Sequence, residues 1–244
     1  MLISNKPTSR HSELGFSLLE MAIVMFIISL LLGGLMMSLG ASREISNRAE
    51  TEALLQEIVE SLYGFAQATG RLPCPATAVS NGQEDPVGGG VCNERYGFVP
   101  SNTLGLSGEL NADGLLMDRW GSPVRYSVTN ANNSAFTRNN GMRNRGMANL
   151  SPNLRVCANA GCGTIIADNL PVVLLSLGAD WASFDGADVE ETENSGEAVL
   201  SGYRMPNDRN FVSTGYIEDN FDDIVTWIST SILFTRMITA GQLP

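Results

Sequence analysis

One apolar stretch constrains the folding of this chain more than any other part: residues 16–40, FSLLEMAIVMFIISLLLGGLMMSLG. These 25 residues are apolar except for three serines, three glycines and Glu20. A helix of about 20 apolar residues spans a hydrocarbon core of roughly 30 Å. The stretch therefore predicts a membrane span, and Glu20 is a candidate functional residue because a carboxylate at that depth needs a partner.

A short polar segment, residues 1–15, precedes the apolar stretch and contains Lys6, Arg10 and His11. An ordinary secretory signal has its cleavage site after its apolar region. Here the candidate cleavage point, between Gly15 and Phe16, comes before the apolar region. Cleavage there would remove a polar leader and leave the hydrophobic helix on the mature chain. An ordinary signal anchor is the alternative interpretation.

The run GFSLLE, with Gly15, Phe16 and Glu20 ahead of an apolar helix, resembles the prepilin leader of type IV pilins and type II secretion pseudopilins. The resemblance implies that prepilin peptidase cuts after Gly15 and methylates the new amine of Phe16. It also implies that Glu20 meets the amine of a neighbouring subunit during assembly. A buried carboxylate is tolerated mainly when a cation is brought to it, so loss of Glu20 should affect docking more than folding.

The charge of the chain is acidic, with 15 Lys and Arg against 26 Asp and Glu and a formal net charge of −11. This balance argues against a general nucleic-acid-binding surface, which needs clustered basic side chains. A local basic patch at Arg138, Arg143 and Arg145 is one interpretation of residues 137–145. The many Asn and Gly residues there favour a solvated loop instead.

Four cysteines, Cys74, Cys92, Cys157 and Cys162, all follow the predicted span. The basic leader places the N-terminus in the cytoplasm, so the cysteines lie across the membrane, where disulfides persist. Pairing of Cys74 with Cys92 and of Cys157 with Cys162 is favoured, although four cysteines allow three connectivities. A zinc site is the weaker interpretation, because the spacing is wrong and no histidine accompanies the cysteines.

The helix is expected to continue beyond the span. Residues 42–69 place apolar side chains on one face of an amphipathic helix, namely Leu55, Ile58, Val59, Leu62 and Ala66. Gly70 and Pro73 then end it. We therefore predict a leader in 1–15, a long helix in 16–70 with its transmembrane half in 16–40, and one globular domain in 71–244. The expected fold class is α+β, with the second half of the helix packed on an antiparallel sheet.

Within the domain, residues 71–111 are dense in Gly, Pro, Asn and Ser and predict an extended, stapled loop rather than regular structure. A Gly-Ser-Pro turn predicts a hairpin in residues 115–129. Further strands are expected at 154–157, at 170–177 and through 224–229, the last followed by a strand or helix. The hairpin resembles that of major pseudopilins in a pattern of five residues, Asp118, Trp120, Gly121, Pro123 and Tyr126.

Two acidic segments, SLGADW and EDNFDDIVTW, resemble the loop of major pseudopilins that holds a calcium ion. The resemblance implies that calcium would bind the Leu177 carbonyl, Asp180 and one or both of Asp222 and Asp223. Calcium takes six to eight oxygen ligands, and clustered carboxylates can supply them. A long insertion separates the two segments in this chain, and a solvated acidic loop is the favoured alternative.

Enzymatic function is not expected. The only histidine, His11, would leave with the leader, and the cysteines are expected in disulfides. Glu190 and Glu191 lie in a polar loop without apolar surroundings that would raise a pKa. No catalytic residue is therefore assigned, and calcium is the only cofactor considered. A signal-anchored periplasmic enzyme or binding protein is retained as an alternative from a different class.

The resemblance implies a structural subunit of a type IV pilus-like filament, with a type II secretion pseudopilin as the alternative. The implied partners are other pilin or pseudopilin subunits, prepilin peptidase and an inner-membrane assembly platform. The subunit would first be a single-pass inner-membrane protein with its C-terminal domain in the periplasm. It would then enter a pilus or pseudopilus.

Overall fold

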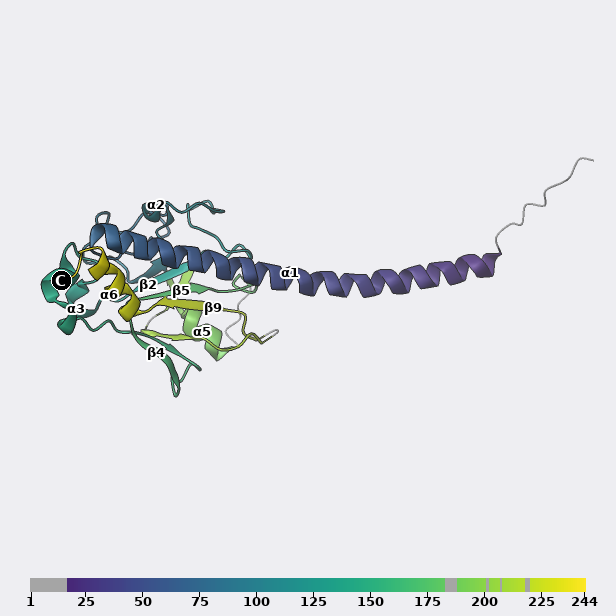
Figure 1. Cartoon of the computed structure of the whole chain (residues 1–244). Coiled ribbons are helices and arrows are strands. Elements are labelled where there is room, and N and C mark those ends of the chain that lie inside the picture. The colour runs from purple at the N-terminus through teal and green to yellow at the C-terminus, as the bar shows by residue number, and fades with distance from the viewer. Residues whose placement is uncertain (1–16, 183–187, 201, 207, 218–219) are drawn as a thin grey trace, which may run out of the picture. The chain divides into compact units, whose positions relative to one another are not determined.

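The computed structural model of the chain describes residues 17–182, 188–200, 202–206, 208–217 and 220–244, without the side chains of 32–39, 41, 198 and 200. Its longest element is helix α1 (Leu18–Thr69) (Figure 1). The Ser17 hydroxyl accepts a hydrogen bond from the backbone N–H of Glu20 at 3.3 Å. A serine followed three residues later by glutamate is the capping-box pattern, which explains where the helix begins. The helix ends, as predicted, before Gly70, whose φ is +76°.

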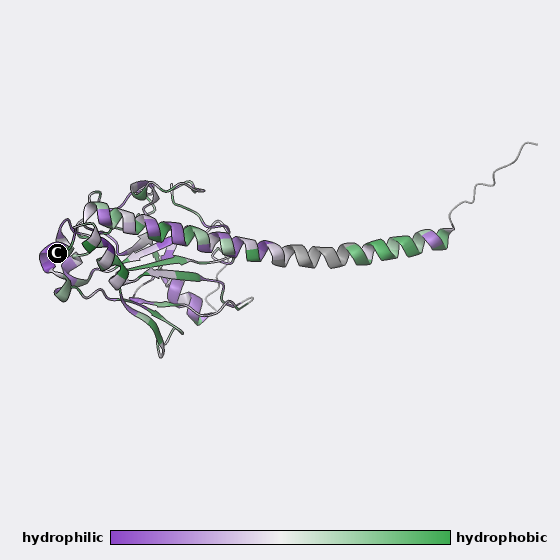
Figure 2. Cartoon of the chain, in the orientation of Figure 1, coloured by the Kyte–Doolittle hydropathy of each residue, from purple (hydrophilic) through white to green (hydrophobic). Residues whose placement is uncertain are grey.

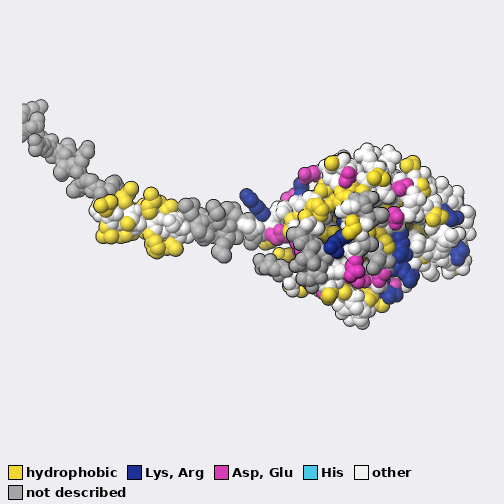
Figure 3. All heavy atoms as spheres, turned by 180° about the vertical axis from the view of Figure 1, so that it is seen from behind, with side chains coloured by type: hydrophobic (Ala, Val, Ile, Leu, Met, Phe, Trp, Pro, Cys, Tyr) yellow, Lys and Arg dark blue, Asp and Glu magenta, His cyan; other side chains and the backbone are white. Residues whose placement is uncertain are grey.

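The chain divides after Ser46 into two compact units. In the first unit, the described start of α1 is largely hydrophobic (Figure 2). Its described apolar side chains are exposed, including Leu18 at 93% and Phe26 at 66% (Figure 3). Across the part of the chain that the structure describes, no helix is both long and apolar enough to span a membrane.

The predicted leader, the cleavage point after Gly15 and the predicted amine of Phe16 lie outside the described residues. The same holds for the side chains of 32–39 within the predicted span.

The second unit is built around a four-stranded antiparallel sheet of order β1-β2-β5-β9. The strands are β1 (Tyr96–Phe98), β2 (Arg125–Val128), β5 (Val172–Ser176) and β9 (Ile224–Ile228). All residues of β2 and β5 are buried. The apolar run in β5 is therefore explained by its central position, with a neighbouring strand on each side.

Alternate residues of β5 face two different hydrophobic cores. Val172 and Leu174 belong to a core that also contains the predicted apolar face of α1, whose five residues are all buried. Helix α6 (Thr230–Thr239) contributes Leu233 and Met237 to the same core. The structure thus confirms the α+β class, with the later part of α1 packed on an antiparallel sheet.

The other core contains Val173 of β5 and a second sheet that the sequence analysis did not anticipate. This sheet has the order β4-β3-β8, and its β3–β8 pair is parallel. Its strands are β3 (Leu154–Cys157), β4 (Ile165–Leu170) and β8 (Asn210–Val212). Strands β6 (Ala198–Leu200) and β7 (Tyr203–Met205) pair as a small hairpin. This hairpin lies in the same insertion as β8 and precedes it. The described residues between the two acidic stretches thus include strands β6, β7 and β8.

Two strand predictions need correction. The strand expected over 170–177 begins at Val172, because Pro171 has no N–H to donate and separates it from β4. The hairpin expected over 115–129 is only a tight turn with a bridge between Met117 and Pro123. After that turn, β2 pairs with β1 and β5 instead.

The segments predicted as loops contain short regular elements. Residues 71–111 include β1 and helix α2 (Ser101–Leu104), which ends at Gly105 with a φ of +68°. The Arg-containing segment 137–145 includes α4 (Gly141–Arg145), which follows α3 (Ala131–Ser134) and precedes the 3-10 turn η1 (Met147–Asn149). Met142 of α4 is fully buried, so this segment is anchored in the core rather than solvated throughout.

Candidate functional site

The pairing of β5 with β9 brings two predicted calcium ligands together. In this antiparallel pair Ser176 lies opposite Ile224, so the segment after β5 and the segment before β9 meet at one sheet edge. Asp180 follows β5 and Asp222 precedes β9. Their carboxylates gather with that of Glu191, with ligand oxygens within 4.8 Å of one another.

Glu191 comes from the insertion and was not among the predicted ligands. It lies in helix α5 (Val189–Ser195), whose N-cap Asp188 accepts hydrogen bonds from the backbone N–H groups of Glu190 and Glu191. The backbone N–H of Asp222 donates to Glu191 Oε1 at 3.2 Å. The sequence signal for this contact is weak, because nothing in the spacing shows which residue of a long insertion returns to the sheet edge.

Glu191 is not in the polar surroundings expected for it. The residue is only 5% exposed, and burial, followed by the negative charges of Asp180, Asp222 and Asp188, raises the pKa of its carboxyl to about 7. The sequence predicted no apolar surroundings that would raise the pKa of Glu190 or Glu191. For Glu191 this prediction is wrong. Three nearby carboxylates disfavour one another's ionised forms, and a cation would relieve that repulsion.

Asp223 is held away from this group. Its carboxylate accepts a hydrogen bond from Asn194 Nδ2 at 2.7 Å. Asn194 Nδ2 also donates to the Val212 carbonyl, and Asn194 Oδ1 accepts from the Val212 N–H. Burial and the neighbouring carboxylates raise the pKa of Asp223 well above its usual range. This network attaches α5 to β8 and to the start of β9. Leu177, the remaining predicted ligand, lines the adjacent cavity.

The Asp118 turn supports the loop after β5. Asp118 is buried and accepts hydrogen bonds from the backbone N–H groups of Trp120 and Ser122 and from the hydroxyl of Ser176. Burial raises the pKa of Asp118. The indole of Trp181 donates to the Trp120 carbonyl at 3.3 Å. The motif that resembled a pseudopilin hairpin thus positions the segment that carries Asp180.

Gly178 allows the chain to turn there. It has a φ of +65°, and a Cβ at this position would overlap the carboxylate of Asp222. That carboxylate accepts a hydrogen bond from the backbone N–H of Ala179. Only glycine combines this backbone conformation with so close an approach.

A cavity of about 270 Å³ adjoins the carboxylates and contains a residue to which the sequence analysis gave no role. Arg125 of β2 lines it, is 5% exposed and contacts the rings of Phe98 and Tyr203 at 4.7 and 5.4 Å from their centroids. Its Nη1 donates to the sulfur of Met205 at 3.4 Å. A buried arginine in the middle of a sheet is unusual and has no signal in the surrounding VRYSV pattern.

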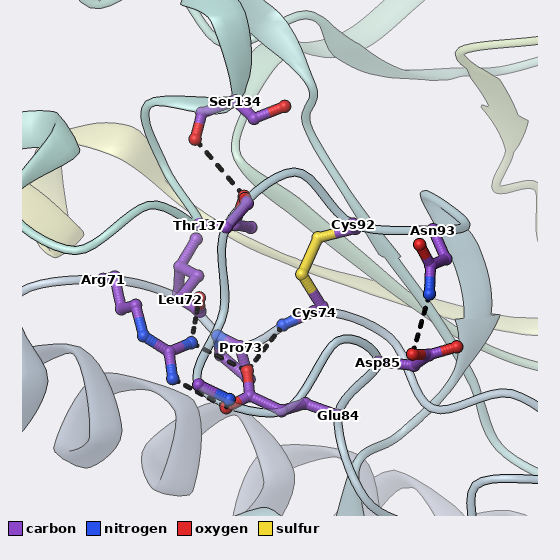
Figure 4. The surroundings of a disulfide bond; sticks show 12 residues. Arg71, Leu72, Pro73, Cys74, Glu84, Asp85, Cys92, Asn93, Ser134 and Thr137 are labelled. Atoms are coloured by element: carbon purple, nitrogen blue, oxygen red, sulfur yellow. Dashed lines mark hydrogen bonds and ion pairs between the residues drawn. A yellow bond between two sulfur atoms is a disulfide. The ribbon is translucent and has the colours of Figure 1, made fainter.

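The four cysteines form two disulfides, Cys74–Cys92 and Cys157–Cys162. The Cα atoms of Cys74 and Cys92 are 5.4 Å apart. Beside this bond, Arg71 and Glu84 form a bidentate ion pair at 2.7 and 2.6 Å (Figure 4). Glu84 also accepts hydrogen bonds from the backbone N–H groups of Cys74 and Gly88. The loop is therefore fixed by a covalent bond and by a buried charge pair.

The remaining predicted residues are not members of the carboxylate group. Glu20 is exposed in the first turn of α1. Arg143 and Arg145 are exposed on α4, and Arg143 donates to the Gly241 carbonyl at 2.6 Å. Arg138 is partly buried, so the three arginines do not have equal exposure.

Comparison with known proteins places the N-terminal residues in a defined class. Residues 10–36 match the prokaryotic N-terminal methylation motif. This motif is the signature of the prepilin-type leaders of type IV pilins and pseudopilins, which are structural proteins. No curated protein and no solved structure matches the chain. The chain therefore carries a prepilin-type N-terminus, and the resemblance found in the sequence is confirmed at that level.

Proposed function

We propose that this protein is a structural subunit of a type IV pilus-like filament, assembled through its N-terminal helix after removal of the leader. The observation that carries the proposal is the methylation motif at residues 10–36, which includes Gly15, Phe16 and Glu20. Prepilin peptidase, other pilin subunits and an inner-membrane assembly platform are the proposed partners. The inner membrane holds the subunit before assembly.

The exposed apolar side chains of α1 support this proposal. Side chains such as Leu18, Met25 and Phe26 are at least half exposed. Apolar surface of this extent calls for lipid or for the helices of other subunits to cover it. A type II secretion pseudopilin would use the same N-terminus, and recovery of the protein in sheared surface fibres would favour the pilus.

Processing at Gly15 tests the proposal directly. We expect the membrane form of the protein to begin at N-methylated Phe16 in cells with prepilin peptidase and at Met1 in cells without it. Intact-mass and N-terminal analysis of the purified protein measures both. A Gly15→Val variant should stay unprocessed in both strains, because valine replaces the small residue that is typical of a cleavage point. Identical N-termini in both strains would exclude the proposed class of subunit.

We further propose that the group Asp180, Glu191 and Asp222 binds a calcium ion, which would neutralise these carboxylates and fix the loop after β5. Three carboxylates offer up to six oxygens, the lower limit of what calcium takes. The residues therefore fit the ion. The proposed ligand set includes Glu191, and it omits Asp223 because Asn194 holds that side chain.

Calcium should raise the melting temperature of the protein. At a concentration 100 times its dissociation constant it would add about 2.7 kcal/mol, which corresponds to about 5–10 °C for a domain of this size. Thermal unfolding in detergent with EDTA and with calcium measures this. Glu191→Gln should abolish the calcium response and melt above the wild type in EDTA, because it removes repulsion. Glu190→Gln, outside the group, should respond like the wild type; an unchanged response of Glu191→Gln would refute the assignment.

A further inference from the structure

Arg125 is a buried cation, and none of the described carboxylates forms an ion pair with it. It is 5% exposed, and the ion pairs among the described residues do not include it. Within the described part of the chain, its Nε has no hydrogen-bond partner. The guanidinium instead contacts two aromatic rings and the sulfur of Met205. Buried charges are normally paired, so a guanidinium in these surroundings is suited to bind an anion.

A second buried polar atom at the same cavity also supports a site for an anion. Ser195, the last residue of α5, is 4% exposed and lines the cavity. Its Oγ has no hydrogen-bond partner among the residues that the structure describes. Arg125 comes from the central sheet, whereas Ser195 comes from the insertion. Two buried donors from separate elements thus border one space, and a carboxylate can accept hydrogen bonds from both.

The cavity also carries negative charge. Asp180 and Glu191 line it together with Arg125. Burial lowers the pKa of Arg125 to about 10, which leaves it charged at neutral pH, and no carboxylate acts against that effect. The cavity therefore presents a guanidinium and two carboxylates to the same space, and these can bind oppositely charged ends of one molecule.

We propose that this cavity binds a small zwitterionic amino acid, whose carboxylate pairs with Arg125 and Ser195 and whose ammonium faces Asp180 and Glu191. The volume of about 270 Å³ is at the small end of ligand sites. Trp181 and Tyr203 also line the cavity, and their aromatic rings favour an apolar side chain such as that of leucine. This binding goes beyond filament assembly and does not depend on it.

Equilibrium dialysis of the full-length protein in detergent with radiolabelled L-leucine tests the proposal, with EDTA present to remove divalent cations. We expect saturable binding with one site. The analogue without the ammonium, 4-methylpentanoate, and the analogue without the carboxylate, 3-methylbutylamine, should each compete at least about tenfold more weakly than leucine. No saturable binding, or equal competition by either analogue, would overturn the proposal.

Variants assign the two ends of the ligand. Arg125→Gln and Asp180→Asn should each weaken leucine binding by about tenfold or more, whereas Arg155→Gln, in an exposed ion pair with Asp168, should bind like the wild type. Asp180→Asn provides the test if Arg125→Gln does not fold. Calcium should compete with leucine, because both use Asp180 and Glu191. Stronger leucine binding in calcium, or wild-type binding by Asp180→Asn, would refute the ammonium site.

Discussion

Replacing Arg71 with methionine is expected to lower the free energy of unfolding by about 3–5 kcal/mol. Arg71 and Glu84 have side chains only 6% and 4% exposed, and their bidentate pair lies beside the Cys74–Cys92 disulfide. Removing the cation leaves the Glu84 carboxylate buried with only backbone N–H donors. That residual charge, rather than the lost attraction alone, is the source of the large effect.

Urea unfolding of the detergent-solubilised protein, followed by tryptophan fluorescence, measures this difference. Arg155→Met is the matched control, because its ion pair with Asp168 is 40% and 37% exposed and should contribute less than about 1 kcal/mol. The double variant Arg71→Met/Glu84→Leu should recover part of the loss, since it leaves no unpaired charge. A loss below about 1 kcal/mol for Arg71→Met would show that Glu84 reaches water or another partner.

The parts of the fold that sequence reasoning predicted depend on local patterns. The amphipathic face of α1 is one example, because Leu55, Ile58 and Leu62 follow the helical period and are all buried. Strand β3 is another, since its short apolar run lies within Leu154–Cys157. The prepilin-type N-terminus is a contiguous motif and was equally visible. Each signal is complete within a short stretch of chain.

The parts that were missed depend on contacts distant in sequence. Strand β8 pairs in parallel with β3, and no local pattern marks the partner of so short a strand. Glu191 contacts Asp222 from helix α5, which Asn194 attaches to β8, and both contacts are distant in sequence. Arg125 occupies a position in VRYSV where an exposed side chain would fit the alternation equally well. Its burial results from the hairpin of β6 and β7, which supplies Tyr203 and Met205.

Replacing Glu20 with leucine is expected to remove the protein from filaments while its globular domain stays folded. Glu20 is an exposed residue of the first unit, so its replacement leaves the hydrophobic cores of the second unit unchanged. In the proposed assembly, its carboxylate compensates the amine of Phe16 in a neighbouring subunit, and without it that cation would be buried unpaired. The measurement is the ratio of protein in sheared filaments to protein in membranes, which should fall at least about tenfold for a loss of 1.4 kcal/mol or more.

A second role for Glu20 must be separated from docking, because the carboxylate also stands at the third position of a capping box begun by Ser17. Glutamine fills that position as well as glutamate does, but carries no charge. Glu20→Gln therefore keeps the start of α1 and removes only the ionic partner. If the charge is what assembly requires, Glu20→Gln and Glu20→Leu should be lost from filaments to the same extent. Normal incorporation of Glu20→Gln would instead assign Glu20 to the helix start, and the amine of Phe16 would need another partner.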